Sequence, residues 1–324
     1  MPLTSIEPLC VVEGGRLTLH GSGFPLSDVP PVVMIGDVQV RVSFASSSRL
    51  IVIVPPQLEG GRMAVRVAEF PGETAFVSLG RIWATGLHQV DSPVFDTHGN
   101  LYVTYSGSRG QESPVSTFRV TAQGTREPFA SGIVNATSMA IGPDGNLYVS
   151  SRFEGVVYRV SSTGSHEVVA SDLGVACGIA FDSSGWMYVG DRSGTIFRVR
   201  DGQVARFATL PPSVAAFHLA MSPEDQLYVT GPTLSPYDHI YTVDRDGNTG
   251  QLPAVFGRPQ GLAFDPEGTL HVVEALAGSS GLYRMRAGAA PELVVAGAAL
   301  VGVALGPSGE LIVSSNETAY RCDL

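Results

Sequence analysis

The chain repeats itself at an interval of 40 to 46 residues. Six segments align without gaps, and each reads as an apolar run, a polar turn and a short alternating strand. They are SPVFDTHGNLYVT from residue 92, SMAIGPDGNLYVS from 138, GIAFDSSGWMYVG from 178, HLAMSPEDQLYVT from 218, GLAFDPEGTLHVV from 261 and GVALGPSGELIVS from 302. Self-similarity at such a period restricts the chain to a repeat architecture, because one unit cannot bury its apolar face alone.

Each segment predicts two strands joined by a tight turn, since Asp-Gly, Ser-Gly and Glu-Gly pairs supply the positive φ of such turns. A second strand pair follows in most units, as in GVVYRVSSTGSHEVVAS from 155 and GTIFRVRDGQVARFATL from 194. Four strands per unit at this period are typical of a propeller blade. The sequence therefore predicts a six-bladed β-propeller over residues 81–324.

The last repeat ends early, at ETAYRCDL, after its third strand. One unassigned strand, RIWATGL from residue 81, precedes the first repeat. We expect residues 81–87 to complete the sixth blade, which closes the ring and leaves no exposed edge strand.

Residues 1–80 do not share the repeat. Alternating strands such as VQVRVSF and MAVRVAEF, bounded by Gly and Pro turns, favour a β-sandwich. Ile6-Glu7-Pro8, Gly14-Gly15, LTLHGSGF (17–24) and Val54-Pro55 resemble the IPT/TIG family, which implies an immunoglobulin-like fold. The chain is thus predicted to be all-β, with a sandwich at 1–80 and a propeller at 81–324. Because no Ser/Gly-rich linker separates them, we expect a fixed arrangement of the two domains.

Composition narrows the function classes. The net charge of −10 argues against binding to nucleic acid or to an anionic membrane. No apolar run approaches the length of a membrane span, and no basic and apolar leader opens the sequence. We expect a cytoplasmic protein if Met1 is the native start, and a periplasmic or cell-surface protein if a signal peptide was removed. All 20 basic residues are Arg, which excludes lysine-dependent sites such as a P-loop or a Schiff base.

The three cysteines, Cys10, Cys177 and Cys322, are widely spaced and form no CxxC motif. An odd number at long spacings argues against a disulfide framework and against a structural zinc site. We expect reduced and mostly buried thiols.

The candidate site lies where the repeat pattern breaks. Residues at the start of the first strand of each blade, and the loops after the second strand, share one face of a propeller at the mouth of its channel. These loops differ in length and chemistry, as functional loops on a rigid frame do. The candidate ligand-binding residues are His88, Arg109, Thr137, Arg152, Glu154, Asp191, Arg192, Asp238, His239, Gln260 and Glu274. Phe217 and Val301 are expected to line the same mouth, and the expected ligand is a small molecule, a glycan or a protein.

The repeats resemble NHL repeats and the SMP-30/gluconolactonase/LRE-like propellers across residues 81–324. In that family a divalent metal is held by the acidic residue of a Glu-x-Pro-x-Trp motif, two Asn and an Asp that is also the general base. Here the motif reads Asp91-Ser92-Pro93-Val94-Phe95, and the other positions read Thr137, Cys177 and Gln260. Asn135 lies two residues before Thr137, which occupies the position of one of the family's Asn ligands. The resemblance implies Asp91 and Asn135 as candidate ligands of Ca²⁺, Mg²⁺ or Zn²⁺.

A second constellation uses softer ligands. Cys177, His218 and Asp91 occupy comparable positions at the starts of different blades. They are ligand types for zinc or copper, and Cys177 with His218 is also a candidate nucleophile and base pair. The alternative is a small buried Cys and a histidine whose hydrogen bonds are satisfied within the channel.

Three functions remain open from the sequence. The propeller is a recognition platform, or a divergent metal-dependent hydrolase of a lactone or ester, or a structural component of the cell envelope. By contrast, the Phe/Tyr-Arg-Val pattern of the third strands, at Arg119, Arg159, Arg198, Arg284 and Arg321, recurs too regularly to be a binding stripe. We expect these arginines to be structural.

Overall fold

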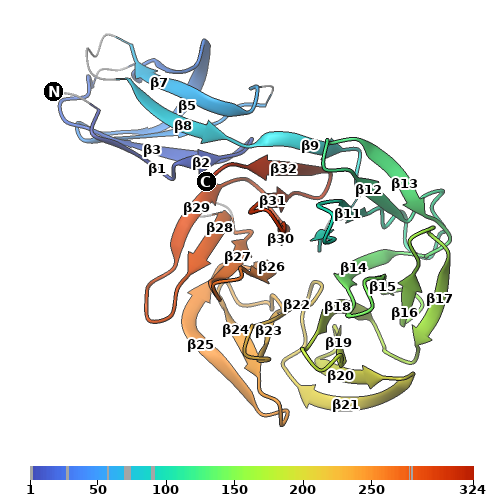
Figure 1. The fold of residues 1–324 in the computed structure, drawn as a ribbon. Coiled ribbons are helices and arrows are strands. Elements are labelled where there is room, and N and C mark those ends of the chain that lie inside the picture. Colours follow the sequence, from blue (N-terminus) through green and yellow to red (C-terminus); the bar gives the residue numbers. More distant parts are fainter. Residues whose placement is uncertain are drawn as a thin grey trace.

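The computed structural model describes residues 3–26, 29–56, 58–68, 74–88, 92–276, 278 and 280–324. Within these ranges the regular elements are all β-strands, which confirms the predicted fold class. The same ranges contain no helix long and apolar enough to cross a membrane. Figure 1 shows a ring of sheets with a smaller sandwich at its edge. Asp91, a candidate metal ligand, lies outside the described residues.

The described part of the sandwich contains eight short strands. They are β1 (Ser5–Glu7), β2 (Cys10–Val11), β3 (Arg16–His20), β4 (Val33–Ile35), β5 (Val38–Ala45), β6 (Arg49–Ile53), β7 (Gly61–Val67) and β8 (Ala75–Leu79). Strand β5 pairs with β4 through its first residues and with β6 through its last, so it belongs to both layers. Alternate residues such as Leu17, Leu19, Leu50 and Val52 point inward and form the core between the layers.

Five blades are separate four-stranded sheets. Blade 1 contains β10 (Val94–Phe95), β11 (Leu101–Thr104), β12 (Thr117–Val120) and β13 (Arg126–Ala130), and blade 2 contains β14 (Ala136–Ile141), β15 (Leu147–Ser151), β16 (Val156–Val160) and β17 (His166–Ala170). Blade 3 contains β18 (Ala176–Phe181), β19 (Met187–Asp191), β20 (Thr195–Arg200) and β21 (Gln203–Thr209), and blade 4 contains β22 (His218–Met221), β23 (Leu227–Thr230), β24 (Asp238–Val243) and β25 (Thr249–Phe256). Blade 6 contains β30 (Gly302–Leu305), β31 (Leu311–Ser314), β32 (Thr318–Cys322) and β9 (Arg81–Thr85).

Blade 5 contains β26 (Pro259–Phe264), β27 (Leu270–Glu274), β28 (Gly281–Met285) and β29 (Glu292–Ala296), and it is not a separate sheet. Its outer strand pairs with β2, so blade 5 and the sandwich form one continuous 12-stranded sheet. The innermost strands β10, β14, β18, β22, β26 and β30 contact one another in turn, and β30 contacts β10. With blade 5 included, the closed ring therefore has six four-stranded units.

The closing strand lies where the sequence predicts it. Strand β9 pairs antiparallel with β32, with Thr85 opposite Thr318 and Arg81 opposite Arg321. The final blade thus combines the two ends of the propeller segment, and Figure 1 shows β9 running from the sandwich directly onto β32. The first and last strands of the propeller segment are thus paired with each other.

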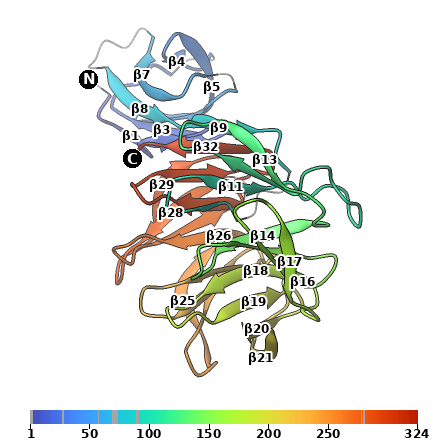
Figure 2. The ribbon, with the colours of Figure 1, turned by 45° about the vertical axis from the view of Figure 1, so that its right-hand side comes forward.

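The sandwich is attached along the ring edge beside blades 5 and 6 (Figure 2). Strand β2 pairs in parallel with β8, where Cys10 is opposite Ser78, and with β29, where Cys10 is opposite Val295. A two-residue strand gives no sequence pattern, so this pairing was not predicted. It covers the outer edge of blade 5, which would otherwise present free backbone groups.

The repeated tyrosines have a structural role. In three blades the Tyr of the second strand donates its hydroxyl to the Asp of the preceding turn: Tyr102 to Asp96 at 3.3 Å, Tyr148 to Asp144 at 3.2 Å and Tyr188 to Asp182 at 3.0 Å. In blade 5 His271 replaces the Tyr, and its Nε2 lies 3.3 Å from Asp265 Oδ2. Each pair fastens a strand to the turn that precedes it.

The regularly spaced arginines are also structural. Arg119 and Arg284 pair with Glu127 and Glu292 on the neighbouring outer strand, at 2.7 and 2.8 Å. Arg198 has no acidic residue opposite it and lies over the Trp186 ring instead, 4.5 Å from the centroid. These contacts lie on the outer part of each blade and away from the channel.

The turn aspartates make stability depend on pH. Burial acts to raise the pKa of Asp96, but hydrogen bonds from Asn100 and from the backbone of His98 outweigh it and lower the pKa. The pKa of Asp144 is lowered in the same way. Since these carboxyls ionise more readily when folded, their stabilisation is present above the unfolded pKa of about 4 and is lost as the pH falls through the folded values.

We expect the free energy of unfolding, measured in urea, to be nearly flat between about pH 5 and 7 and to fall below about pH 4. The Asp96→Asn variant should show a shallower fall than the parent because one of the depressed carboxyls is gone. An equal slope for the two proteins would contradict the assignment to this turn.

Candidate functional site

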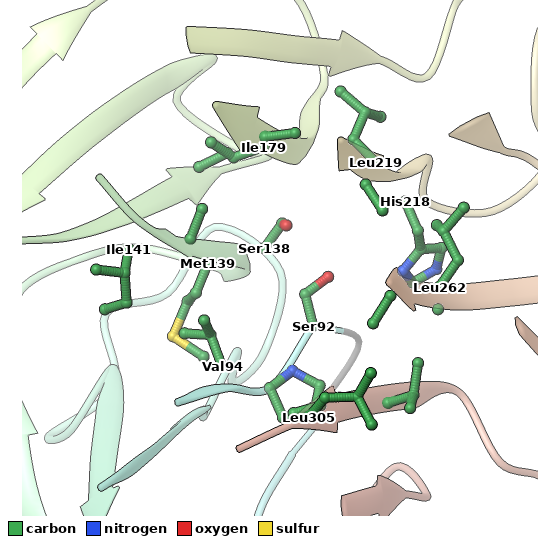
Figure 3. A pocket seen from close by; sticks show the side chains of 18 of the residues that line it. Ser92, Val94, Ser138, Met139, Ile141, Ile179, His218, Leu219, Leu262 and Leu305 are labelled. Atoms are coloured by element: carbon green, nitrogen blue, oxygen red, sulfur yellow. The ribbon is translucent and has the colours of Figure 1, made fainter. Parts of the chain in front are cut away.

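The six innermost strands enclose a cavity of ≈ 280 Å³ at the centre of the ring (Figure 3). It is lined by residues 92–95, 138–141, 179–180, 218–220, 261–264 and 303–305, so every blade contributes. Most of the lining side chains are apolar, with Met139, Ile179, Leu219, Leu262 and Leu305 among those labelled in Figure 3. Among the described residues that line it, no side chain is an arginine, an aspartate or a glutamate.

The polar side chains of this lining gather at one end. Ser92, Ser138 and His218 occupy equivalent repeat positions, at the start of the inner strands of blades 1, 2 and 4. In Figure 3 the hydroxyls of Ser92 and Ser138 lie near the centre of the view, and the imidazole of His218 lies to their right. The start of each inner strand lies at the face that also carries the variable loops, because the inner strand and the second strand are antiparallel. The side chains of the channel are therefore polar at its mouth and apolar below it.

His218 is held by a residue of the next blade. Its side chain is only 2% exposed, and its Nε2 lies 3.3 Å from the Oε1 of Gln260, which is itself buried. The His218–Gln260 pair joins blades 4 and 5 at the channel mouth. Both residues were sequence candidates, and the structure brings them together.

Hydroxyls at the ends of the second strands also connect neighbouring blades. Ser150 Oγ donates to the backbone oxygen of Cys177 at 2.6 Å, and Thr230 Oγ1 donates to that of Gln260 at 2.5 Å. Sequence reasoning missed these bonds, although the Ser or Thr that ends most of the repeats was visible. They keep the starts of the inner strands at a constant height, which positions the mouth residues.

Two predicted site residues face away from the channel. Thr137 Oγ1 donates to the backbone oxygen of Asn135 at 2.9 Å, and the Cys177 thiol donates to that of Val175 at 3.3 Å. Both side chains are buried, and neither is among the described residues that line the cavity. Phe217, also expected at the mouth, is buried among the residues of blades 3 and 4. The expectation that these three line the channel was wrong, because alternation along the strand turns them between the blades.

The side chain of Asn135 is hydrogen-bonded to a neighbouring loop. Its φ of 50° lies in the left-handed region, its Oδ1 accepts from the Gly110 amide at 2.7 Å, and its Nδ2 donates to the backbone oxygens of Ser106 and Ser108 at 2.7 and 3.0 Å. These bonds pin the loop after β11 to the start of β14. The carbonyl oxygen that a metal would need already accepts a hydrogen bond.

The family's metal ligands have no equivalent set at the described positions. Thr137 and Cys177 hydrogen-bond to backbone oxygens, and Gln260 pairs with His218. Ca²⁺ and Mg²⁺ require several carboxylate or carbonyl oxygens, which these three side chains do not present. Within the part of the chain that the structure describes, no three His, Cys, Asp or Glu residues form a group that could hold a metal ion. These residues do not fit the family's divalent metal.

The buried acids at the mouth cap their own loops. Asp191 accepts from the Val175 amide at 2.9 Å and from the Ser193 amide at 3.2 Å. Asp238 accepts from the Thr233 amide at 3.1 Å and its hydroxyl at 2.6 Å. Glu274 is likewise buried. Asp191 and Asp238 thus use carboxylate oxygens to hold the loops at the mouth, and their contact with a ligand stays a prediction.

The remaining candidates lie at the rim or outside it. Arg109, Arg192 and Glu154 are exposed, and Arg152 and His88 are half-buried. Glu154 accepts from the Tyr158 hydroxyl at 3.0 Å; burial, together with this carboxylate, raises the pKa of Tyr158 to about 12. His239 Nδ1 lies 2.8 Å from the Leu252 backbone oxygen on the outer strand β25, so it does not reach the channel.

Comparisons with known proteins agree with the two parts of the fold. Residues 2–73 match the model of the IPT/TIG domain, which confirms that prediction for the sandwich. No curated protein matches the chain in sequence. Similar solved structures include an auxiliary nutrient binding protein from Bacteroides thetaiotaomicron, with 13% identity, coverage of 99% of this chain and 97% of that chain, and a TM-score of 0.58.

Two further similar structures are enzymes. One is a gluconolactonase from Xanthomonas campestris, with 12% identity, coverage of 91% of this chain and 98% of that chain, and a TM-score of 0.62. The other is a catalytically inactive virginiamycin B lyase from Staphylococcus aureus, solved with quinupristin, with 11% identity, coverage of 95% and 100%, and a TM-score of 0.53. At these identities the similarity establishes a shared fold.

Proposed function

We propose that this protein is a recognition propeller that binds a small neutral molecule at the polar mouth of its central channel. The observation that carries the proposal is the gathering of Ser92, Ser138 and His218 at one end of a cavity whose other lining side chains are apolar. A few convergent polar groups in an otherwise apolar pocket are typical of small-molecule sites, where they orient the ligand.

Size and charge restrict the ligand. A volume of ≈ 280 Å³ is at the lower end for ligand pockets, so the enclosed part is smaller than a drug-sized molecule. A buried ion without a partner is strongly disfavoured, and the described lining offers no arginine or carboxylate. A neutral ligand that turns hydroxyl or carbonyl groups toward the mouth, such as a lactone or a small sugar, matches this surface.

The rim supports a binding role. Phe153, which is 54% exposed, and the exposed residues Leu234 and Tyr237 lie in loops that follow the second strands of blades 2 and 4. Arg109 and Arg192 are exposed on equivalent loops of blades 1 and 3. Apolar and guanidinium groups around a mouth contact the part of a ligand that extends beyond the channel. The similar nutrient binding protein is consistent with such use of the fold.

Substitution of His218 tests the proposal. We expect one or more members of a panel of neutral monosaccharides and aldonolactones to bind, as measured by calorimetry and thermal shift. The His218→Leu variant should bind about 5- to 100-fold more weakly, since one hydrogen bond to a buried group is lost. Ser138→Ala should weaken binding in the same direction and disturbs packing less.

His239→Leu is the matched control, because that imidazole bonds to Leu252 outside the channel. It should leave affinity unchanged. Equal binding of gluconate and its lactone, or full affinity in both His218→Leu and Ser138→Ala, would contradict a neutral ligand held at this mouth.

A second function, hydrolysis of a lactone or ester at the same mouth, is favoured by the buried imidazole of His218, a side chain suited to general base catalysis. Lactone turnover that His218→Leu abolishes would establish it. Turnover that requires added Ca²⁺, Mg²⁺ or Zn²⁺ and is lost in Asp91→Ala would instead point to the metal site implied by the family resemblance.

A further inference from the structure

The first and last cysteines of the chain lie side by side. Cys10 is in β2 of the sandwich and is 1% exposed, and Cys322 ends β32 of blade 6 and is 3% exposed. Both belong to one hydrophobic cluster with Val12, Val295 and Tyr320. All three cysteines of the protein are free thiols in this structure.

The junction between β8 and β9 fixes this proximity. Cys10 is opposite Ser78 in the sheet, and two residues later Gly80 donates its amide to the Val11 backbone oxygen at 2.9 Å. A Cβ on Gly80 would lie 3.2 Å from Cys322 Sγ and 2.6 Å from Val12 Cγ1. Cys322 thus packs directly against the segment that β2 pairs with.

The two thiols also interact electrostatically. A hydrogen bond with the Cys322 thiol lowers the pKa of Cys10. The same hydrogen bond, together with burial, raises the pKa of Cys322 well above its usual range. One thiol of the pair therefore ionises before the other, as in a nucleophilic and a resolving cysteine.

We propose that Cys10 and Cys322 are an oxidation site at which a peroxide joins the sandwich to the closing blade through a disulfide. The Cys10 sulfur attacks one peroxide oxygen, the O–O bond breaks, and a sulfenic acid and one water form. The Cys322 sulfur then attacks the sulfenic sulfur, the S–O bond breaks, and the hydroxyl leaves with the thiol proton as a second water. Two thiols and one hydrogen peroxide become one disulfide and two waters.

A small cavity lies near the pair. A cavity of ≈ 20 Å³ is lined by Val12, Gly80 and Tyr320, which all pack near the thiols. That volume admits a molecule of about the size of water, and hydrogen peroxide is little larger. Glutathione is far too large for this cavity, so peroxide is the oxidant class that the site fits.

The bond would connect the two ends of the chain. It would restrain β32, which closes the ring, and it would hold the sandwich against blade 6. A cross-link that closes so long a loop restricts the unfolded chain strongly. The expected rise in melting temperature is about 5–10 °C.

Peptide mapping of the full-length protein tests this. Because the chain has no Lys, trypsin cuts only after Arg and places Cys10 in residues 1–16, Cys177 in 160–192 and Cys322 in 322–324. After brief treatment with hydrogen peroxide and alkylation in denaturant, we expect a 1–16 peptide linked to 322–324. The mass of the linked peptide should be about 2 Da below the summed masses of the two reduced peptides, because two hydrogen atoms are lost. Dithiothreitol should reverse both the linkage and the gain in melting temperature.

Cys177→Ser is the matched control and should give the same linked peptide, because the Cys177 thiol donates to Val175 within another cluster. Cys322→Ser should abolish the linkage and leave Cys10 as a sulfenic or sulfinic acid. The proposal fails if Cys10 and Cys322 are still reduced, and so still react with the alkylating agent, at peroxide doses that oxidise Cys177. It also fails if the linkage joins two different chains. The wild-type map decides this even if a variant does not fold.

Discussion

A chain that begins at residue 86 is expected to yield no soluble protein, whereas one that begins at residue 81 is expected to fold. The five residues between these starts are β9, the outer strand of blade 6. Without β9, the strand β32 presents a free edge, and the apolar cluster that contains Ala84, Ile312 and Ala319 is opened. The free energy lost with this strand is expected to exceed the net stability of a domain, which is ~5–15 kcal/mol.

The chain that begins at 81 also lacks the sandwich and its strand β2. It loses Cys10 and Val12 from the cluster beside blades 5 and 6, and the edge of β29 becomes free. We expect it to be monomeric by size exclusion, with cooperative thermal unfolding at a melting temperature about 5–10 °C below the full-length protein. A monomeric and cooperatively melting chain that begins at 86 would show that β9 is dispensable for closure.

Phe217→Ala is expected to destabilise the protein by about 3–5 kcal/mol, the usual cost of emptying a large buried aromatic site. Phe217 is 1% exposed, and its ring fills a space left by two glycines. A Cβ on Gly231 would lie 2.1 Å from the ring, and one on Gly190 would lie 3.1 Å from Phe217 Cβ. Because the surrounding β-sheet backbone cannot collapse into the vacated volume, the cavity should persist.

Urea denaturation measures this effect, and Phe153→Ala is the matched control because its ring is 54% exposed. The control should change the free energy of unfolding by no more than about 0.5 kcal/mol. A cost below about 1 kcal/mol for Phe217→Ala would mean that the junction of blades 3 and 4 is loosely packed. Phe217 is the residue before His218, which lines the cavity. Ligand binding by this variant should therefore be compared with that of the parent at a temperature at which both are folded.

The repeat pattern predicted the propeller because each blade is a local structure. Turn residues such as Asp182 and Asp265, and the strand residues around Leu147 and Leu270, contact partners within their own unit. The closing strand was found in the same way, since a repeat that lacks one strand at its end must recover it elsewhere. The motifs of the sandwich were sufficient to identify its domain family.

Site residues were predicted less well because a shift of one residue along an inner strand moves a side chain from the channel to the space between the blades. Thr137 and Cys177 lie one repeat position before that of His218, and their side chains turn between the blades and away from the cavity. Asp191 and Asp238 lie in loops at the predicted face, yet their oxygens are used within those loops. Of the residues proposed for chemistry, His218 lines the cavity, and Gln260 holds it from the next blade.

The sequence by itself determined the elements: the blades, the strand that closes them and the family of the first domain, because these depend on periodicity and short-range pairing. Only the tertiary structure decided which elements meet at long range. Closing the ring brings β32 to β9, and the sandwich then places β2 between β8 and β29. That closure puts Cys10 beside Cys322 and Ser92, Ser138 and His218 around one channel, and neither grouping is encoded in any local stretch of the chain.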